Sequence, residues 1–110
     1  MFSPELKKGS MELLVLSMLT DRPRHGYEIG QTIELRSGGR FEFKVSTLYP
    51  VLARMEKRGW IVGRWVEKAG ERRRCFYSLT AEGRRVLAHQ REQWREFIAA
   101  VGMVVEGNHA

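Results

Sequence analysis

The stretch STLYPVLARMEKRG, residues 46–59, carries the pattern that indicates the fold of the chain. Leu48, Val51, Leu52 and Met55 recur at the spacing of a single helix face. This periodicity predicts an amphipathic helix with one buried side. The opposite side is then free to meet solvent or a partner.

Both ends of this helix carry sequence signals. We expect Thr47 to be the N-cap, with Leu48, Tyr49 and Pro50 at the first three helical positions. A proline there lacks only an amide hydrogen that would be unpaired in any case. Gly59 ends the helix, because glycine readily takes the left-handed conformation that follows a helix C-terminus.

Helices are expected before this stretch and a β-hairpin after it. Apolar periodicity predicts helices over residues 5–20 and 27–36 and a last helix from 81 to 105. β-rich runs over residues 60–66 and 72–79 flank a polar turn with a glycine, which predicts a hairpin. This order is that of a winged helix-turn-helix, a mainly α fold with a small β-hairpin.

The positive charge of the chain is concentrated in its middle. With 19 Lys and Arg against 13 Asp and Glu, the net charge is +6. Charges balance in residues 1–43, whereas residues 44–85 hold eleven basic against four acidic side chains. This segment contains both the 46–59 helix and the hairpin, so a phosphate backbone is the expected partner. Double-stranded DNA is therefore favoured over a membrane surface.

The 110 residues are expected to form one continuous unit with two functional parts. Residues 1–80 are assigned to a winged helix-turn-helix DNA-binding part and residues 81–110 to a helix for dimerisation. Apolar residues of the last helix recur near a seven-residue spacing. The first helix is apolar on more than one face, which also favours a second copy of the chain.

Several classes of protein are not indicated. A single cysteine offers no disulfide framework and suits a reducing compartment, so a cytoplasmic location is expected. No apolar run approaches the roughly 20 residues of a membrane span, and no secretory signal is visible. His25, His89 and His109 have no metal-ligand spacing with one another or with Cys75. Because catalytic motifs are also missing, neither a metal, a cofactor nor enzymatic activity is expected.

Three parts of the chain resemble PadR-family transcriptional regulators. Residues 25–29 (HGYEI) are similar to the second-helix motif of that family, and residues 46–52 with 54–59 are similar to its recognition helix. The third part resembles its wing and the start of its dimerisation helix and consists of Arg72, Arg73, Arg74, Tyr77, Leu79, Thr80, Glu82 and Gly83. The resemblance covers about residues 9–105, and the single final helix looks like the compact branch of the family.

The resemblance implies a homodimer in which the last helix packs on the partner's first helix. It also implies repression of nearby promoters, relieved by small molecules that are often aromatic or cationic. Tyr27 resembles a family position close to the DNA backbone. Cys75 departs from the family pattern, in which a basic or polar residue is more usual at this position. The departure puts one wing contact in doubt but not the fold.

Candidate DNA contacts gather at the start of the 46–59 helix and in the hairpin. Hydroxyl groups bond phosphates or base edges, and a helix N-terminus attracts phosphate. The alternatives are capping by Thr47, core packing by Tyr49, and a charged edge strand that discourages aggregation. Strand alternation would turn Arg73 away from its neighbours, and Arg54 could face the DNA backbone or solvent. The candidates are Tyr27, Lys44, Ser46, Thr47, Tyr49, Arg54, Arg72, Arg73 and Arg74.

Trp94 is the candidate ligand residue. The resemblance implies that a tryptophan at this place lines a pocket at the dimer centre and stacks planar compounds, with Phe97 and Leu87 in the same wall. The alternative is an aromatic residue in a coiled-coil-like seam, which the heptad spacing explains unaided. The candidate dimer contacts are Leu13, Leu16, Leu87, Trp94, Ile98 and Val101.

Other interpretations stay open at this point. His25 is expected to cap or pack at the start of the second helix rather than to sense pH. Cys75 is expected to be a small buried hydrophobe rather than a redox sensor. Instead of a DNA-binding regulator, the chain could be a winged-helix module that binds a protein, or a carrier that sequesters drugs around Trp94.

Overall fold

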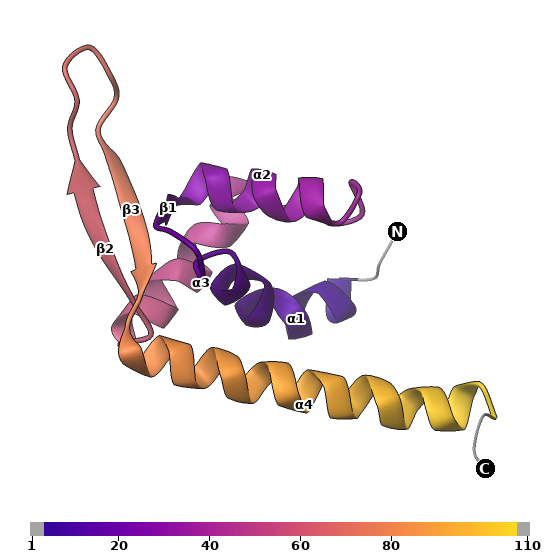
Figure 1. Ribbon diagram of the computed structural model, residues 1–110. Coiled ribbons are helices and arrows are strands. Elements are labelled where there is room, and N and C mark those ends of the chain that lie inside the picture. Colours follow the sequence, from indigo (N-terminus) through magenta and orange to yellow (C-terminus); the bar gives the residue numbers. More distant parts are fainter. Residues whose placement is uncertain (1–3, 108–110) are drawn as a thin grey trace.

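The computed structural model describes residues 4–107, with side chains described from Ser10 onward. Four helices and a small three-stranded antiparallel sheet form a winged helix-turn-helix, which confirms the expected fold class. In Figure 1 the hairpin rises from one end of the molecule, while the last helix passes beneath the first and extends beyond it. The elements are α1 (Pro4–Ser17), β1 (Arg24–His25), α2 (Gly26–Arg36), α3 (Val45–Lys57), β2 (Ile61–Val66), β3 (Arg74–Leu79) and α4 (Ala81–Val105).

The first helix is shorter than predicted. α1 ends at Ser17 rather than at residue 20, and Met18 and Leu19 follow in tighter turns, donating to the carbonyls three residues back. Just after the helix ends, the buried guanidinium of Arg24 donates to the carbonyl of Met18 at 3.2 Å. A side chain from outside the helix thus satisfies a carbonyl that follows its last turn.

The start of α3 differs from the prediction. The N-cap is Lys44, which makes no side-chain capping bond, and Thr47 lies inside the first turn with its own amide donating to the Lys44 carbonyl at 2.9 Å. The expectation that Thr47 caps the helix is therefore wrong. Pro50 lies in the second turn and cannot donate to the carbonyl of Ser46. Because Ser46 is exposed, water can take the place of that missing bond.

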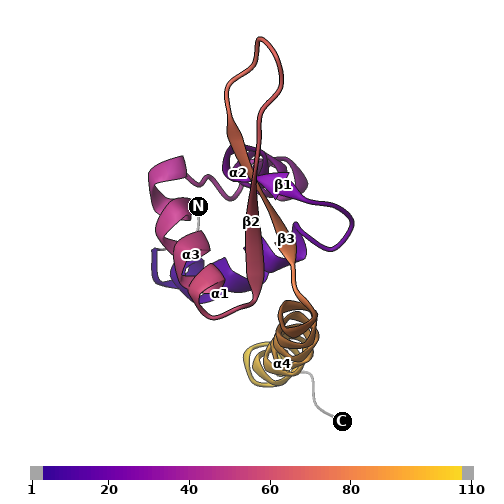
Figure 2. The ribbon, with the colours of Figure 1, turned by 90° about the vertical axis from the view of Figure 1, so that its left-hand side faces the viewer.

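The sheet contains a strand that the sequence did not reveal. β3 lies in the centre, paired with β2 on one side and with the two-residue β1 on the other. Figure 2 shows this arrangement from the side of the hairpin, with α4 leaving its base. β3 begins at Arg74, so Arg72 and Arg73 belong to the connecting loop. The expected alternation of facing therefore does not apply to those two side chains.

The core lies between α1, α2, α3 and the base of the hairpin. It includes the predicted stripe of α3 and, from other elements, Leu16, Ile29, Ile61 and Leu87. Gly30 lets α2 approach α3, since a Cβ atom there would lie 3.0 Å from Cδ1 of Leu48. This close packing leaves the opposite face of α3 open to the outside.

Candidate nucleic-acid interface

The exposed start of α3 forms the centre of the candidate interface. Ser46, Thr47 and Pro50 are exposed there, and Lys44 is exposed immediately before them. The first turn contains no acidic residue. The amide groups at the very start of the helix and the helix dipole therefore favour an anion at this end. Hydroxyls, a lysine and a helix N-terminus together can bind phosphates and reach base edges.

Two tyrosines border this surface where α2 and α3 meet. The ring of Tyr49 rests on Gly26, where a Cβ atom would lie 3.3 Å from its Cε1, Cζ and hydroxyl oxygen. Tyr49 keeps 47% of its surface exposed, so the alternative of full core packing does not hold. Tyr27 is also exposed, and its hydroxyl accepts a hydrogen bond from the side-chain amide of Gln31 at 3.1 Å.

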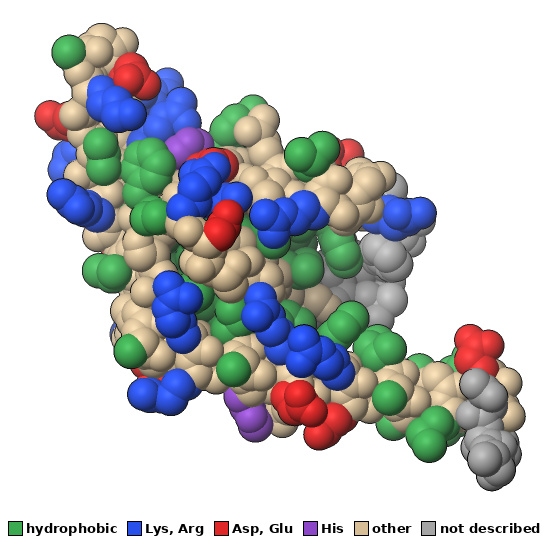
Figure 3. Space-filling model, in the orientation of Figure 1, with side chains coloured by type: hydrophobic (Ala, Val, Ile, Leu, Met, Phe, Trp, Pro, Cys, Tyr) green, Lys and Arg blue, Asp and Glu red, His purple; other side chains and the backbone are tan. Residues whose placement is uncertain are grey.

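The hairpin, which we call the wing (residues 61–79), carries four exposed arginines, Arg64 in β2 and the three candidates Arg72, Arg73 and Arg74. The guanidinium of Arg73 stacks over the ring of Trp65 at 4.6 Å and lies 3.5 Å from the carboxylate of Glu67. Such stacking holds a guanidinium in place while leaving its edge free to donate. Arg74 turns toward the sheet, and Arg72 is exposed in the loop. Figure 3 shows basic side chains gathered along this part of the molecule.

His25 joins the wing to the start of α2. Its Nδ1 atom accepts from the amide of Glu28 at 3.2 Å, which confirms the expected capping role. Its Nε2 atom lies 2.8 Å from Nη1 of Arg74. Burial, followed by the charge of Arg74, lowers the pKa of His25. The neutral form is therefore favoured, and it provides one accepting nitrogen at a time.

Arg54 occupies a different environment from the other candidates. Its Nε atom lies 3.8 Å from the carboxylate of Glu12 on α1, which also pairs with Arg58 at 3.1 Å. The side chain thus turns toward α1 rather than standing free on the exposed face of α3. The sequence could not reveal this partner, because Glu12 is 42 positions away and belongs to another helix.

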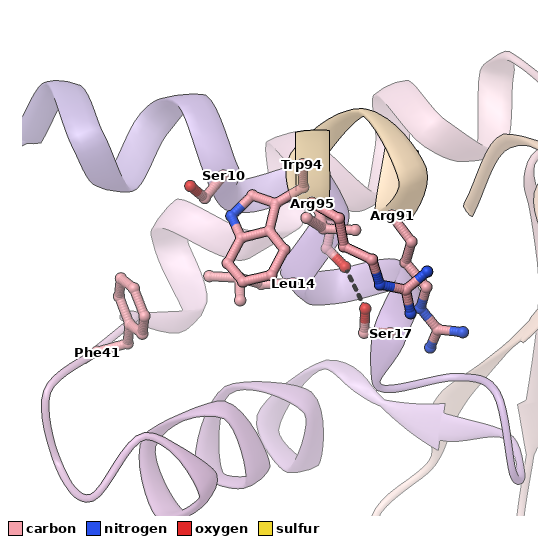
Figure 4. Close-up of a pocket in the computed structure, with 8 residues that line it drawn as sticks. Ser10, Leu14, Ser17, Phe41, Arg91, Trp94 and Arg95 are labelled. Atoms are coloured by element: carbon pink, nitrogen blue, oxygen red, sulfur yellow. Dashed lines mark hydrogen bonds between the residues drawn. The ribbon is translucent and has the colours of Figure 1, made fainter. Parts of the chain in front are cut away.

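Trp94 lines a pocket of about 330 Å³ between α1, α4 and the segment before α3. Figure 4 shows its indole ring at the centre of the lining residues, with Phe41 on one side and the guanidinium groups of Arg91 and Arg95 on the other. Leu87 and Phe97, expected in the same wall, do not line this pocket. Leu87 is buried in the core, and Phe97 is exposed farther along α4. The remaining lining residues are Ser10, Leu13, Leu14 and Ser17.

The candidate dimer contacts fall into two groups. Leu16 and Leu87 are enclosed in the core of a single chain, so their side chains are not available to a partner. Trp94, Ile98 and Val101 are exposed on α4, and Leu13 of α1 is partly buried beside them at the pocket. Hydrophobic side chains continue along the projecting part of α4 in Figure 3. Cys75 is half-buried and packs against the core.

Residues 10–107, whose side chains are described, contain no group of three or more His, Cys, Asp or Glu that could hold a metal ion. Within the same residues, no helix combines the length and apolar character needed to cross a bilayer.

The exposed helix α3, which we call the reading helix, the basic wing and the long terminal helix define a winged helix-turn-helix protein of the transcription-regulator class. The model of the PadR-like family of transcriptional regulators matches residues 15–89. The chain belongs to this family. The family and the structural neighbours are transcriptional regulators and not enzymes, which agrees with the expectation from the sequence.

Individual relatives match most of the chain. The uncharacterized protein X of Lysinibacillus sphaericus is 28% identical over 107 residues, covering 97% of this chain and 98% of the relative. A transcriptional regulator from Clostridium thermocellum has a TM-score of 0.86 at 28% identity, covering 96% of this chain and 99% of its own. A PadR family regulator from Eggerthella lenta has a TM-score of 0.79 at 35% identity, covering 94% and 88%. The fold of Bacillus subtilis PadR, solved with operator DNA, matches 73% of this chain and 45% of its own at 24% identity and a TM-score of 0.67.

Proposed function

We propose that this chain is a homodimeric, ligand-responsive repressor that binds double-stranded DNA of a specific sequence. The observation that carries the proposal is the exposed, acid-free start of α3, which lies in the same basic segment as the wing. In this class of fold the third helix enters the major groove and the wing follows the backbone. Such a protein acts where the DNA is, so we place it in the cytoplasm.

Each candidate residue has a distinct role in this proposal. Ser46 and Thr47 read base edges or bind the nearest phosphates, and Lys44 binds phosphate at the helix N-terminus. Tyr49 and Tyr27 lie beside the major groove of the bound DNA and contact its sugar-phosphate backbone. The wing arginines bind phosphates or the minor groove, and Arg73 is the best placed because Trp65 already orders its guanidinium. Arg54, which is paired with Glu12, is not part of this set.

The homodimer is supported by the apolar surface of α4. Trp94, Phe97, Ile98 and Val101 are exposed on a helix that projects beyond the rest of the chain. Apolar rows of this kind on one helix are typical of helix–helix association. We assign residues 81–110 to dimerisation. A two-fold pair would read two half-sites about 34 Å apart, one turn of DNA.

The effector is proposed to be a small aromatic molecule that stacks on Trp94. The pocket has the size and apolar lining of a small-molecule site. Its walls come from α1 and from α4, so an occupant contacts both helices. In a dimer, a change in the angle between these helices would alter the distance between the DNA-binding surfaces of the two chains. Binding of the small molecule would thereby be coupled to binding of DNA.

The test is a selection of bound fragments from the DNA upstream of the coding sequence, repeated with a panel of planar aromatic compounds. We expect enrichment of a pseudo-palindromic site and its loss with at least one compound that quenches tryptophan fluorescence. Recovery of fragments without a common site contradicts the proposal. If the chain instead retains a tight protein partner after the wing arginines are removed, the alternative of a protein-interaction module is correct.

A further inference from the structure

The surface of α3 has an outward row and two flanks. With 100° between successive residues, Ser46, Pro50, Ala53 and Lys57 point away from the buried stripe, and all four are exposed. Residues 54 and 58 fall on the flank that faces α1. Arg54 and Arg58 are each about half exposed, so their long side chains can reach either α1 or a ligand seated on the outward row.

A single carboxylate holds both of these arginines. Oε2 of Glu12 lies 3.1 Å from Nη1 of Arg58 and 3.8 Å from Nε of Arg54. Within residues 10–107, these are the only ion pairs that join α1 to α3 or to its C-cap residue Arg58. Because all three side chains remain partly exposed, the pairs contribute little to the stability of the fold. Their larger effect is on the charge that α3 presents to a polyanion.

We propose that Glu12 is a specificity-determining residue that withholds Arg54 and Arg58 from DNA phosphates. The proposal rests on the DNA-binding function proposed above. Phosphate contacts raise the affinity for DNA of every sequence, because each one releases condensed counterions. By keeping two cations at the edge of the reading helix, Glu12 lowers the affinity for unrelated DNA while leaving the base-reading residues at the start of α3 untouched.

The variant Glu12→Gln tests this inference, because it removes the charge but keeps the size of the side chain. We expect it to bind a duplex of scrambled sequence more tightly, with a steeper fall of affinity as salt is raised. If both arginines gain a phosphate, the slope of log affinity against log salt steepens by about 1.8. The ratio of the variant's affinity for the scrambled duplex to that of the unaltered chain then falls about tenfold between about 50 and about 200 mM salt.

The control is Glu92→Gln, which removes the same charge next to Arg95 on α4, far along the chain from α3. It should leave the salt slope unchanged. A second control adds Glu12→Gln to a chain that already carries Arg54→Gln and Arg58→Gln, where we expect no further gain.

The inference is wrong if Glu12→Gln leaves the salt slope unchanged, or if Glu92→Gln changes it by the same amount. It is also wrong if Glu12→Gln raises the affinity for the scrambled duplex by the same factor in the chain that lacks Arg54 and Arg58. Thermal unfolding of each variant verifies that the fold is retained. If the unaltered chain binds no DNA at all, the proposed function fails and this inference fails with it.

Discussion

The guanidinium of Arg74 lies 2.8 Å from Nε2 of His25, so the first residue of β3 meets the residue that caps α2. The two are 49 positions apart in the chain. This contact ties the wing to the helix that supports the reading helix. A neutral imidazole accepts on one nitrogen only, so His25 bonds either to Arg74 or to the amide of Glu28, depending on which nitrogen carries its hydrogen. A protonated ring would accept from neither and would repel Arg74.

The contact predicts that acid weakens the fold through His25. Burial and Arg74 lower the pKa of His25 below its ordinary value of 6.5, so the unfolded chain binds its proton at a higher pH than the folded chain. The free energy of unfolding should be undiminished above the unfolded pKa and fall as the pH drops through that value toward the lowered pKa. Urea denaturation at a series of pH values measures this.

The matched variant is His25→Asn, which keeps a capping side chain but does not titrate. Its free energy of unfolding should show a smaller loss between neutral and mildly acidic pH than that of the unaltered chain. The same pH dependence in both would show that His25 is not the responsible group.

Two glycines of α4 should respond oppositely to alanine. A Cβ atom at Gly83 would lie 1.9 Å from the carbonyl oxygen of Trp60, whereas at Gly102 nothing lies within 4 Å. Gly83→Ala should therefore destabilise the chain by about 1–3 kcal/mol, because backbone has to move. Gly102→Ala should stabilise the helix by up to about 1 kcal/mol. Thermal unfolding distinguishes them, and equal melting temperatures would contradict the packing described for α4.

The wing and the reading helix should differ in how they affect DNA binding. Replacing Arg73 and Arg74 with alanine should weaken binding to all sequences alike and lower the salt slope by about 1 for each lost phosphate contact. Replacing Ser46 or Thr47 with alanine should instead alter the preference among sequences. Binding measured on a set of single-base variants of the site separates the two effects. If the arginine variants lose affinity for some sequences but not for others, the wing reads bases and its assignment to phosphate contacts is wrong.

Association should depend on the exposed row of α4. Ile98→Lys places a charge in this row, while Ala99→Lys adds the same charge at an exposed position on the other side of the helix. We expect Ile98→Lys to shift the mass measured by light scattering from two chains toward one, and Ala99→Lys to leave it unchanged. A dimer that survives Ile98→Lys as well as Ala99→Lys would place the interface elsewhere.

Sequence periodicity predicted most of the fold because it reports which side of a helix is buried. The stripe of Leu48, Val51, Leu52 and Met55 is buried as expected. Periodicity does not report where a helix begins, and the N-terminus of α3 depends on the extended backbone of Lys44. The two residues of β1 are too few to show a pattern, and they form a strand only because β3 lies beside them.

The part of the candidate site that consists of neighbours in the chain was predictable from the sequence. Lys44, Ser46 and Thr47 are exposed next to one another because they are neighbours in the chain and lie at a helix start. The pocket around Trp94 was only partly predictable. Its lining includes Phe41 from an irregular segment and Ser10 from α1, and their arrival beside α4 depends on tertiary packing that no local pattern encodes.

The most direct test of the proposed function is a salt titration of binding to the selected site and to a scrambled duplex, followed by fluorescence anisotropy. At equal salt we expect the site to be bound at least about a thousandfold more tightly. Both affinities should fall steeply as salt increases, because phosphate contacts contribute to each. Equal affinity for the two duplexes, or affinities that do not change with salt, would contradict sequence-specific DNA binding by this chain.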